Sequence, residues 1–134
     1  MSQPIPDLWP DFGETNLITP LTILKAQATA LAKKTNGLVE ATVTSSSEAN
    51  GDFIHRFYLV APVLDYRYHL LTVFHDIKLY PLRIEFLIEG LQSKLGGSLK
   101  DEAAFESCLT NIFASEKTIQ IIRALISQSR VATV

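Results

Sequence analysis

An alternation of apolar and polar residues dominates the chain between Leu38 and Ile88. Alternation with a period of two is typical of β-strands with one face toward water, because successive side chains of a strand point to opposite faces. Turn residues such as Asn50-Gly51 divide this stretch into segments. The pattern therefore predicts a four-stranded antiparallel meander with strands over 38–46, 53–62, 67–76 and 80–89.

Helical patterns flank this meander on both sides. Thr19 suits an N-cap and Pro20 suits the first helical position, where no N–H is needed, so we predict a helix over 20–35. After a polar loop bracketed by Gly90, Gly96 and Gly97, apolar residues return at helical spacing. They predict helices over 101–114 and 116–129, joined at Ser115 by a break or a bend.

The order of these elements predicts an α+β fold. It consists of an N-terminal helix, the four-stranded antiparallel meander, and two C-terminal helices packed on the sheet. At 134 residues the chain fits one domain over 19–134, preceded by a proline-rich apolar arm over 1–18.

The two middle strands are apolar on both faces. Phe57 and Leu59 alternate with Tyr58 and Val60, and the next strand carries a similar double set. A sheet with helices on one side alone would show polar residues on its other face. We therefore expect a second cover, which could be the arm, a C-terminal helix or a second copy of the protein.

The arm itself combines prolines, which keep it extended, with the large apolar side chains of Leu8, Trp9 and Phe12. Leaving such side chains in water is costly, so we expect the arm to dock. Docking across its own domain is the favoured interpretation, and reaching onto a second subunit or another partner is the alternative.

Composition narrows the functional classes. The chain is 47% hydrophobic and 19% charged, against about 25% charged in an average soluble domain, which favours an apolar surface hidden in a partner. A net charge of −2 with scattered Lys and Arg gives nucleic-acid binding no electrostatic basis. The single cysteine, Cys108, the lack of a secretion signal and the lack of a membrane span predict a cytoplasmic protein.

Three histidines lie on the central strands: His55, His69 and His75. In an antiparallel hairpin His55 would lie close to His75 or Phe74. Asp76 follows His75 directly and so points to the opposite face, and no HxH or HxxxH pair occurs. We therefore expect structural histidines, with no metal ligand, no catalytic residue and no cofactor.

Two functions remain after these exclusions. The first is a non-enzymatic protein that acts through protein–protein contacts, as a homo-oligomer or as an accessory, immunity-like or chaperone-like partner. The alternative is a small-molecule binding module or enzyme with an aromatic pocket between sheet and helices. Residues predicted to form the pocket or interface are His55, Phe57, Tyr58, Tyr68, Phe74, His75 and Trp9.

Overall fold

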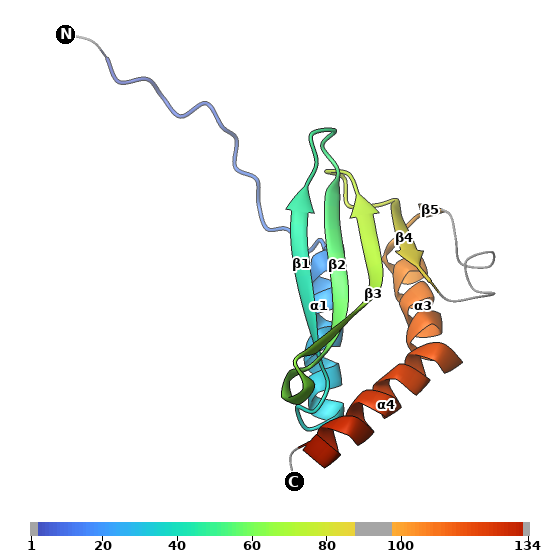
Figure 1. Cartoon of the computed structure of the whole chain (residues 1–134). Helices are drawn as coiled ribbons and strands as arrows, with labels where there is room; N and C mark the ends of the chain where they lie inside the picture. Colours follow the sequence, from blue (N-terminus) through green and yellow to red (C-terminus); the bar gives the residue numbers. More distant parts are fainter. Residues whose placement is uncertain (1–2, 88–97, 133–134) are drawn as a thin grey trace.

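The computed structural model describes residues 3–87 and 98–132 (Figure 1). Its elements follow in the order α1 (Pro20–Lys34), β1 (Glu40–Ser47), β2 (Phe53–Ala61), the 3-10 turn η1 (Pro62–Leu64), β3 (Tyr66–His75), β4 (Leu82–Phe86), β5 (Ser98–Leu99), α3 (Glu102–Phe113) and α4 (Glu116–Ala132). The predicted α+β fold, with its first helix, antiparallel sheet and two C-terminal helices, is confirmed.

The sheet has five strands in the order β1-β2-β3-β4-β5, and each pairs antiparallel with its neighbour. The prediction of four strands was wrong by one, because β5 has two residues and so shows no alternation. β4 is also shorter than the predicted strand 80–89. Residues 88–89 of that strand and the predicted loop bracketed by Gly90, Gly96 and Gly97 fall within 88–97, outside the described residues.

Side-chain caps mark the starts of α1, α3 and α4. The Thr19 hydroxyl accepts a hydrogen bond from the Thr22 backbone N–H at 3.1 Å, and the Asp101 carboxylate accepts one from Ala104 N–H at 2.8 Å. Each cap satisfies a donor that lacks a partner within the helix. The helical conformation is interrupted between α3 and α4, where Ser115 Oγ accepts a hydrogen bond from Thr118 N–H and caps the start of α4.

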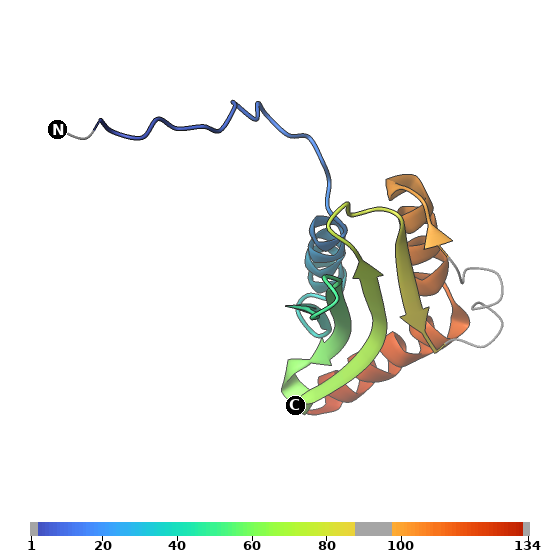
Figure 2. The ribbon, with the colours of Figure 1, turned by 90° about the horizontal axis from the view of Figure 1, so that it is seen from above.

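All three helices cover the same face of the sheet, as Figures 1 and 2 show. α1 lies against β1, and α4 crosses β2 and η1. The core forms between these layers from strand residues such as Phe57, Leu59 and Val73 and from helix residues such as Leu24 and Phe105. The residue before the N-cap of α1 is additionally linked to the β3–β4 connection, because the Tyr80 hydroxyl donates to Ile18 O at 3.4 Å.

A β-bulge accounts for part of the doubly apolar pattern of the middle strands. Phe57 pairs with Leu71 and Tyr58 pairs with His69, which leaves Leu70 without a partner on β2. Leu70 and Leu71 are both buried in the core although they are adjacent in sequence. The two apolar sets of β3 are therefore not two opposite faces of one regular strand.

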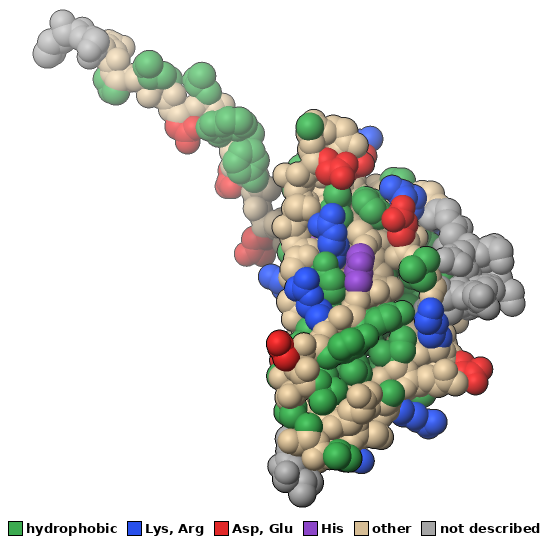
Figure 3. All heavy atoms as spheres, in the orientation of Figure 1, with side chains coloured by type: hydrophobic (Ala, Val, Ile, Leu, Met, Phe, Trp, Pro, Cys, Tyr) green, Lys and Arg blue, Asp and Glu red, His purple; other side chains and the backbone are tan. Residues whose placement is uncertain are grey.

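Arginine side chains shield the outer face of the sheet, where no helix of the described chain lies. The Arg67 guanidinium carbon lies 4.1 Å from the centre of the Tyr58 ring, and that of Arg83 lies 4.3 Å from the Phe74 ring. Arginine stems cover apolar surface while the charged heads stay in water. The expected second cover is thus replaced by side chains of the sheet itself, and Figure 3 shows apolar, basic and histidine side chains mixed on this face.

The N-terminal arm leaves the first turn of α1 and extends away from the body (Figures 1 and 2). Its Leu8, Trp9 and Phe12 side chains are 82%, 75% and 76% exposed. The favoured interpretation, docking across its own domain, is therefore wrong for this conformation. The prolines keep the arm extended as predicted, but it touches nothing of the described body that would bury these side chains.

Candidate functional site

A buried pair of histidines lies on the helix-covered face of the sheet. His55 of β2 and His75 of β3 are 5% and 7% exposed, and their Nε2 atoms lie 2.8 Å apart. The register places His75 opposite Phe53 and His55 opposite Val73, so the two imidazoles are diagonal neighbours on one face. The predicted proximity of His55 to His75 is confirmed.

Hydrogen bonds at both ends of the pair fix the positions of its protons. His75 Nδ1 lies 2.7 Å from the carbonyl oxygen of Asp76, and because a carbonyl can only accept, this nitrogen carries a proton. With both rings neutral, His75 Nε2 then accepts from the Nε2–H of His55. His55 Nδ1 in turn accepts from the Ser45 hydroxyl at 2.7 Å. The result is one directed chain from Ser45 to Asp76.

Burial, and secondarily the proximity of His75, lower the pKa of His55 to about 4. The side chain therefore stays neutral at physiological pH. Ser45 is exposed and donates to this neutral ring, which is the geometry of a nucleophile beside a base. A base with so low a pKa accepts a proton poorly near pH 7, so the arrangement gives little activation of the hydroxyl.

The Ser45 contact was missed by sequence reasoning, which predicted a first strand over 38–46 without assigning its register against the second strand. In the structure β1 continues to Ser47, and Ser45 pairs with His55. The available signal was the length of the β1–β2 turn, which sets the register of the whole hairpin.

Among the described residues, the His55–His75 pair has no carboxylate or thiol placed beside it as a third metal ligand. Asp76 offers its backbone carbonyl to His75, while its carboxylate accepts from Lys78 N–H at 2.8 Å. Within residues 3–87 and 98–132, no group of three or more His, Cys, Asp or Glu side chains is placed to hold a metal ion.

The other predicted site residues lie in separate places. Tyr58 and Phe74 are on the outer face, where Tyr58 stacks with His69 at a centroid distance of 4.9 Å. Tyr68 is on the helix-covered side and lines a shallow hollow with Leu64 and Leu125. Phe57 is in the core, and Trp9 stands on the arm. The structure thus brings together His55 and His75 and separates the rest.

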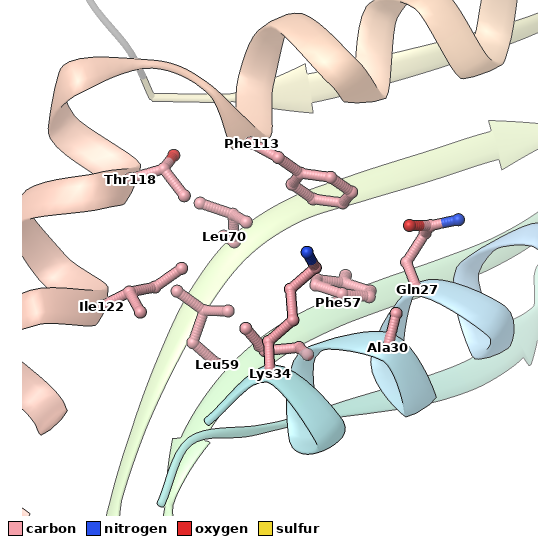
Figure 4. Close-up of a pocket in the computed structure, with 10 residues that line it drawn as sticks. Gln27, Ala30, Lys34, Phe57, Leu59, Leu70, Phe113, Thr118 and Ile122 are labelled. Carbon is pink, nitrogen blue, oxygen red and sulfur yellow. The ribbon is translucent and has the colours of Figure 1, made fainter. Parts of the chain in front are cut away.

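A small apolar pocket opens where the three helices meet over the sheet. Its volume is about 130 Å³, and its floor is formed by Phe57, Leu59 and Leu70. Figure 4 shows Phe113, Thr118 and Ile122 on one side and α1 on the other, with Lys34 reaching over the apolar floor. The remaining lining residues are Gln27, Ala30 and Leu31 of α1.

Sequence reasoning named Phe57 among these lining residues and missed the others. They come from five different elements, α1, β2, β3, α3 and α4. Most of them are apolar residues at a spacing that is typical of an ordinary core. The pocket lies between α1 and α4 over the sheet, and no motif in the sequence predicts the separation of these two helices.

Comparisons with protein-family models, with curated proteins and with solved structures found no match for this chain. In the part of the chain that the structure describes, no helix has the length and apolar character needed to cross a bilayer.

Proposed function

We propose that this protein acts through protein–protein contacts, in the first place with further copies of itself, and not through catalysis. The observation that carries the proposal is the arm. Ile5, Leu8, Trp9, Phe12 and Leu17 are each at least 75% exposed. Complete burial of one such side chain is worth about 1.5 to 3 kcal/mol, so a partner that covers several of them gains a large part of a binding free energy.

The total accessible surface supports the same proposal. A folded monomer of 14.9 kDa is expected to expose about 7,000 Å². This chain exposes 9225 Å². The exposed arm contributes to this excess of roughly 2,000 Å², which is larger than the ~800 Å² that each partner buries in a standard protein–protein interface.

Charge and cysteine usage favour a protein partner over a nucleic acid. The net charge is −2, and Arg67 and Arg83 are engaged with aromatic rings of the outer face. Cys108 is buried, and burial raises the pKa of its thiol, which makes it a packing residue and not a nucleophile. A single buried cysteine also suits a reducing compartment such as the cytoplasm.

The test is the molecular mass in solution, measured by light scattering across micromolar concentrations for two proteins. One is the full chain, and the other carries Leu8→Ser, Trp9→Ser and Phe12→Ser, which keeps the length of the arm. We expect the full chain to form an oligomer and the triple variant to be smaller. A monomeric mass for the full chain at every concentration would refute homo-oligomerisation.

A second function is favoured by the pocket alone, namely binding of a small apolar ligand. Its volume of about 130 Å³ is close to that of an engineered cavity of about 150 Å³ that binds benzene. It is below the ~300 Å³ at which typical ligand sites begin. The pocket therefore fits one ring and not a cofactor, and saturable stabilisation of the triple variant by benzene would support this function.

A further inference from the structure

We propose that the pocket between α1, α3 and α4 receives the Trp9 side chain from the arm of a second copy, with Asp7 and Asp11 of that arm beside Lys34. This inference rests on the proposed function, because it names the surface through which the chain would associate with itself. Three observations lead to it: the gap in the helical layer, the fit of one ring, and the opposite charges of arm and pocket rim.

The pocket is a gap in the helical layer. Phe57, Leu59 and Leu70 form a floor that faces the space between α1 and α4. Phe57 and Leu59 are each only 1% exposed, so the surface open to a partner comes mainly from the half-buried Leu31, Phe113 and Ile122 around the floor. Atoms that line such a space lack van der Waals partners on one side. An aromatic side chain inserted there would supply those partners in a water-poor setting, which is the usual environment of an interface hot spot.

The size of the pocket selects one ring of the arm. About 130 Å³ accommodates one benzene-sized ring, so an indole would enter with its six-membered ring and leave the rest of the side chain at the open rim. The arm offers two neighbouring aromatic residues, Trp9 and Phe12, with ring centroids 6.0 Å apart. Trp9 is the better candidate because Asp7 and Asp11 stand at equal distances on either side of it in the sequence, and Asp7 accepts a hydrogen bond from the Trp9 backbone N–H at 3.0 Å.

Charge fixes the orientation. Residues 1–24 contain Asp7, Asp11 and Glu14 and no Lys or Arg. The charged side chain among the pocket's lining residues is Lys34, which is exposed and follows Lys33 at the end of α1. An acidic segment approaching this end of the helix meets two positive charges, which steers association and places Trp9 over the pocket.

A second copy is favoured over the chain's own arm by the direction of the arm. The pocket uses the second half of α1, whereas the arm starts at the first turn and runs away from the body (Figure 1). Its own arm would have to reverse and run back along the helix. An extended arm reaches a neighbouring molecule without reversal, and two copies that exchange arms form a closed, two-fold symmetric dimer.

A pair of matched substitutions tests the pocket directly. Ala30→Phe places a ring in the pocket from its α1 side, and Ala26→Phe adds the same ring at an exposed position of α1 outside the lining. Trp9 is the single tryptophan of the chain, so its emission reports its environment without interference. We expect a dimer with blue-shifted Trp9 emission for the wild type and for A26F. For A30F we expect at least tenfold weaker dimerisation and emission typical of water-exposed indole.

Charge reversal provides an independent test that does not depend on how A30F folds. Lys34→Glu alone, and Asp7→Lys with Asp11→Lys together, should each weaken dimerisation by about two- to fivefold. A mixture of the two variants, or a chain that carries all three substitutions, should recover wild-type affinity. No recovery in either format would overturn the assigned pairing of Asp7 and Asp11 with Lys34.

The outcomes separate this inference from the proposed function. A dimer that dissociates when the arm is mutated but is unaffected by A30F refutes the pocket and leaves the proposed function standing. A monomer whose blue-shifted emission is lost in A30F shows that the chain's own arm fills the pocket, which overturns the second copy. A monomer with water-exposed Trp9 overturns both.

Discussion

His55 and His75 share one proton between Nε2 atoms that lie 2.8 Å apart, and each ring is held from its other nitrogen by Ser45 or by the Asp76 carbonyl. The chain of hydrogen bonds is complete when both rings are neutral. Protonation of His55 alone keeps the central hydrogen bond but leaves a cation in a buried site. Protonation of both rings would also place two N–H donors against each other and add repulsion between two cations.

Acid should therefore destabilise the fold as His55 takes up a proton. The pKa of His55 is about 4 in the folded chain and 6.5 for the unperturbed group, so between these pH values the unfolded chain binds more protons. The contribution of neutral His55 to the free energy of unfolding is fully present above pH 6.5. It is lost progressively as the pH drops toward 4, by up to about 3 kcal/mol. Urea unfolding at several pH values measures this loss. His55→Gln should flatten the curve in this window.

Two leucines of contrasting burial test the core. Leu109 of α3 is 3% exposed and Leu87 is 78% exposed. Leu109→Ala should lower the free energy of unfolding by about 2 to 5 kcal/mol, because it removes buried atoms and leaves a cavity. Leu87→Ala should change it by less than about 0.5 kcal/mol. Equal losses in urea titrations would contradict the assignment of α3 to the core.

The outer face should depend on its arginines. The Arg67 guanidinium lies over the Tyr58 ring at 4.1 Å, and a contact of this type contributes about 0.5 to 1 kcal/mol at an exposed site. A double-mutant cycle with Arg67→Ala and Tyr58→Leu should give a coupling free energy in this range. The same cycle between Arg67 and Phe74, whose ring lies under Arg83 instead, should give a coupling near zero.

The start of α3 should depend on Asp101. Its carboxylate accepts from Ala104 N–H at 2.8 Å, so Asp101→Ala should cost about 1 kcal/mol of stability. Asp101→Asn, which keeps an oxygen acceptor, should retain most of it. A loss of the same size in both variants would show that charge, and not the cap geometry, supports the helix.

Local chemistry explains what the sequence predicts well in this fold. Thr19-Pro20 and Asp101 act within one helical turn, so local residues suffice to place the helix starts. The first start was predicted at 20, as observed, and the second at 101, one residue before the observed start at 102. Alternation within β1 and β4 likewise identifies each strand without knowledge of its neighbours. The proximity of His55 and His75 was predictable because a short hairpin limits the possible registers.

Features that depend on distant contacts were not predictable in the same way. β5 exists because Leu99 and Ser98 pair with Leu82 and Arg83, and two residues carry no pattern of their own. Ser45 meets His55 through the register of a different hairpin. The pocket depends on how α4 crosses the sheet relative to α1. The conformation of the arm was predicted wrongly, because we expected its apolar side chains to be buried on the surface of their own domain.

The bulge in β3 has a consequence for the pocket. Leu71 faces the helices and His69 faces outward, so removing Leu70 from between them would leave every other residue of β3 on the face that it now occupies. The ladder between β2 and β3 would become regular. Leu70 is in this sense a supernumerary residue of the strand, and it is also part of the pocket floor. The chain therefore departs from a regular sheet at a position that helps to line the opening between its helices.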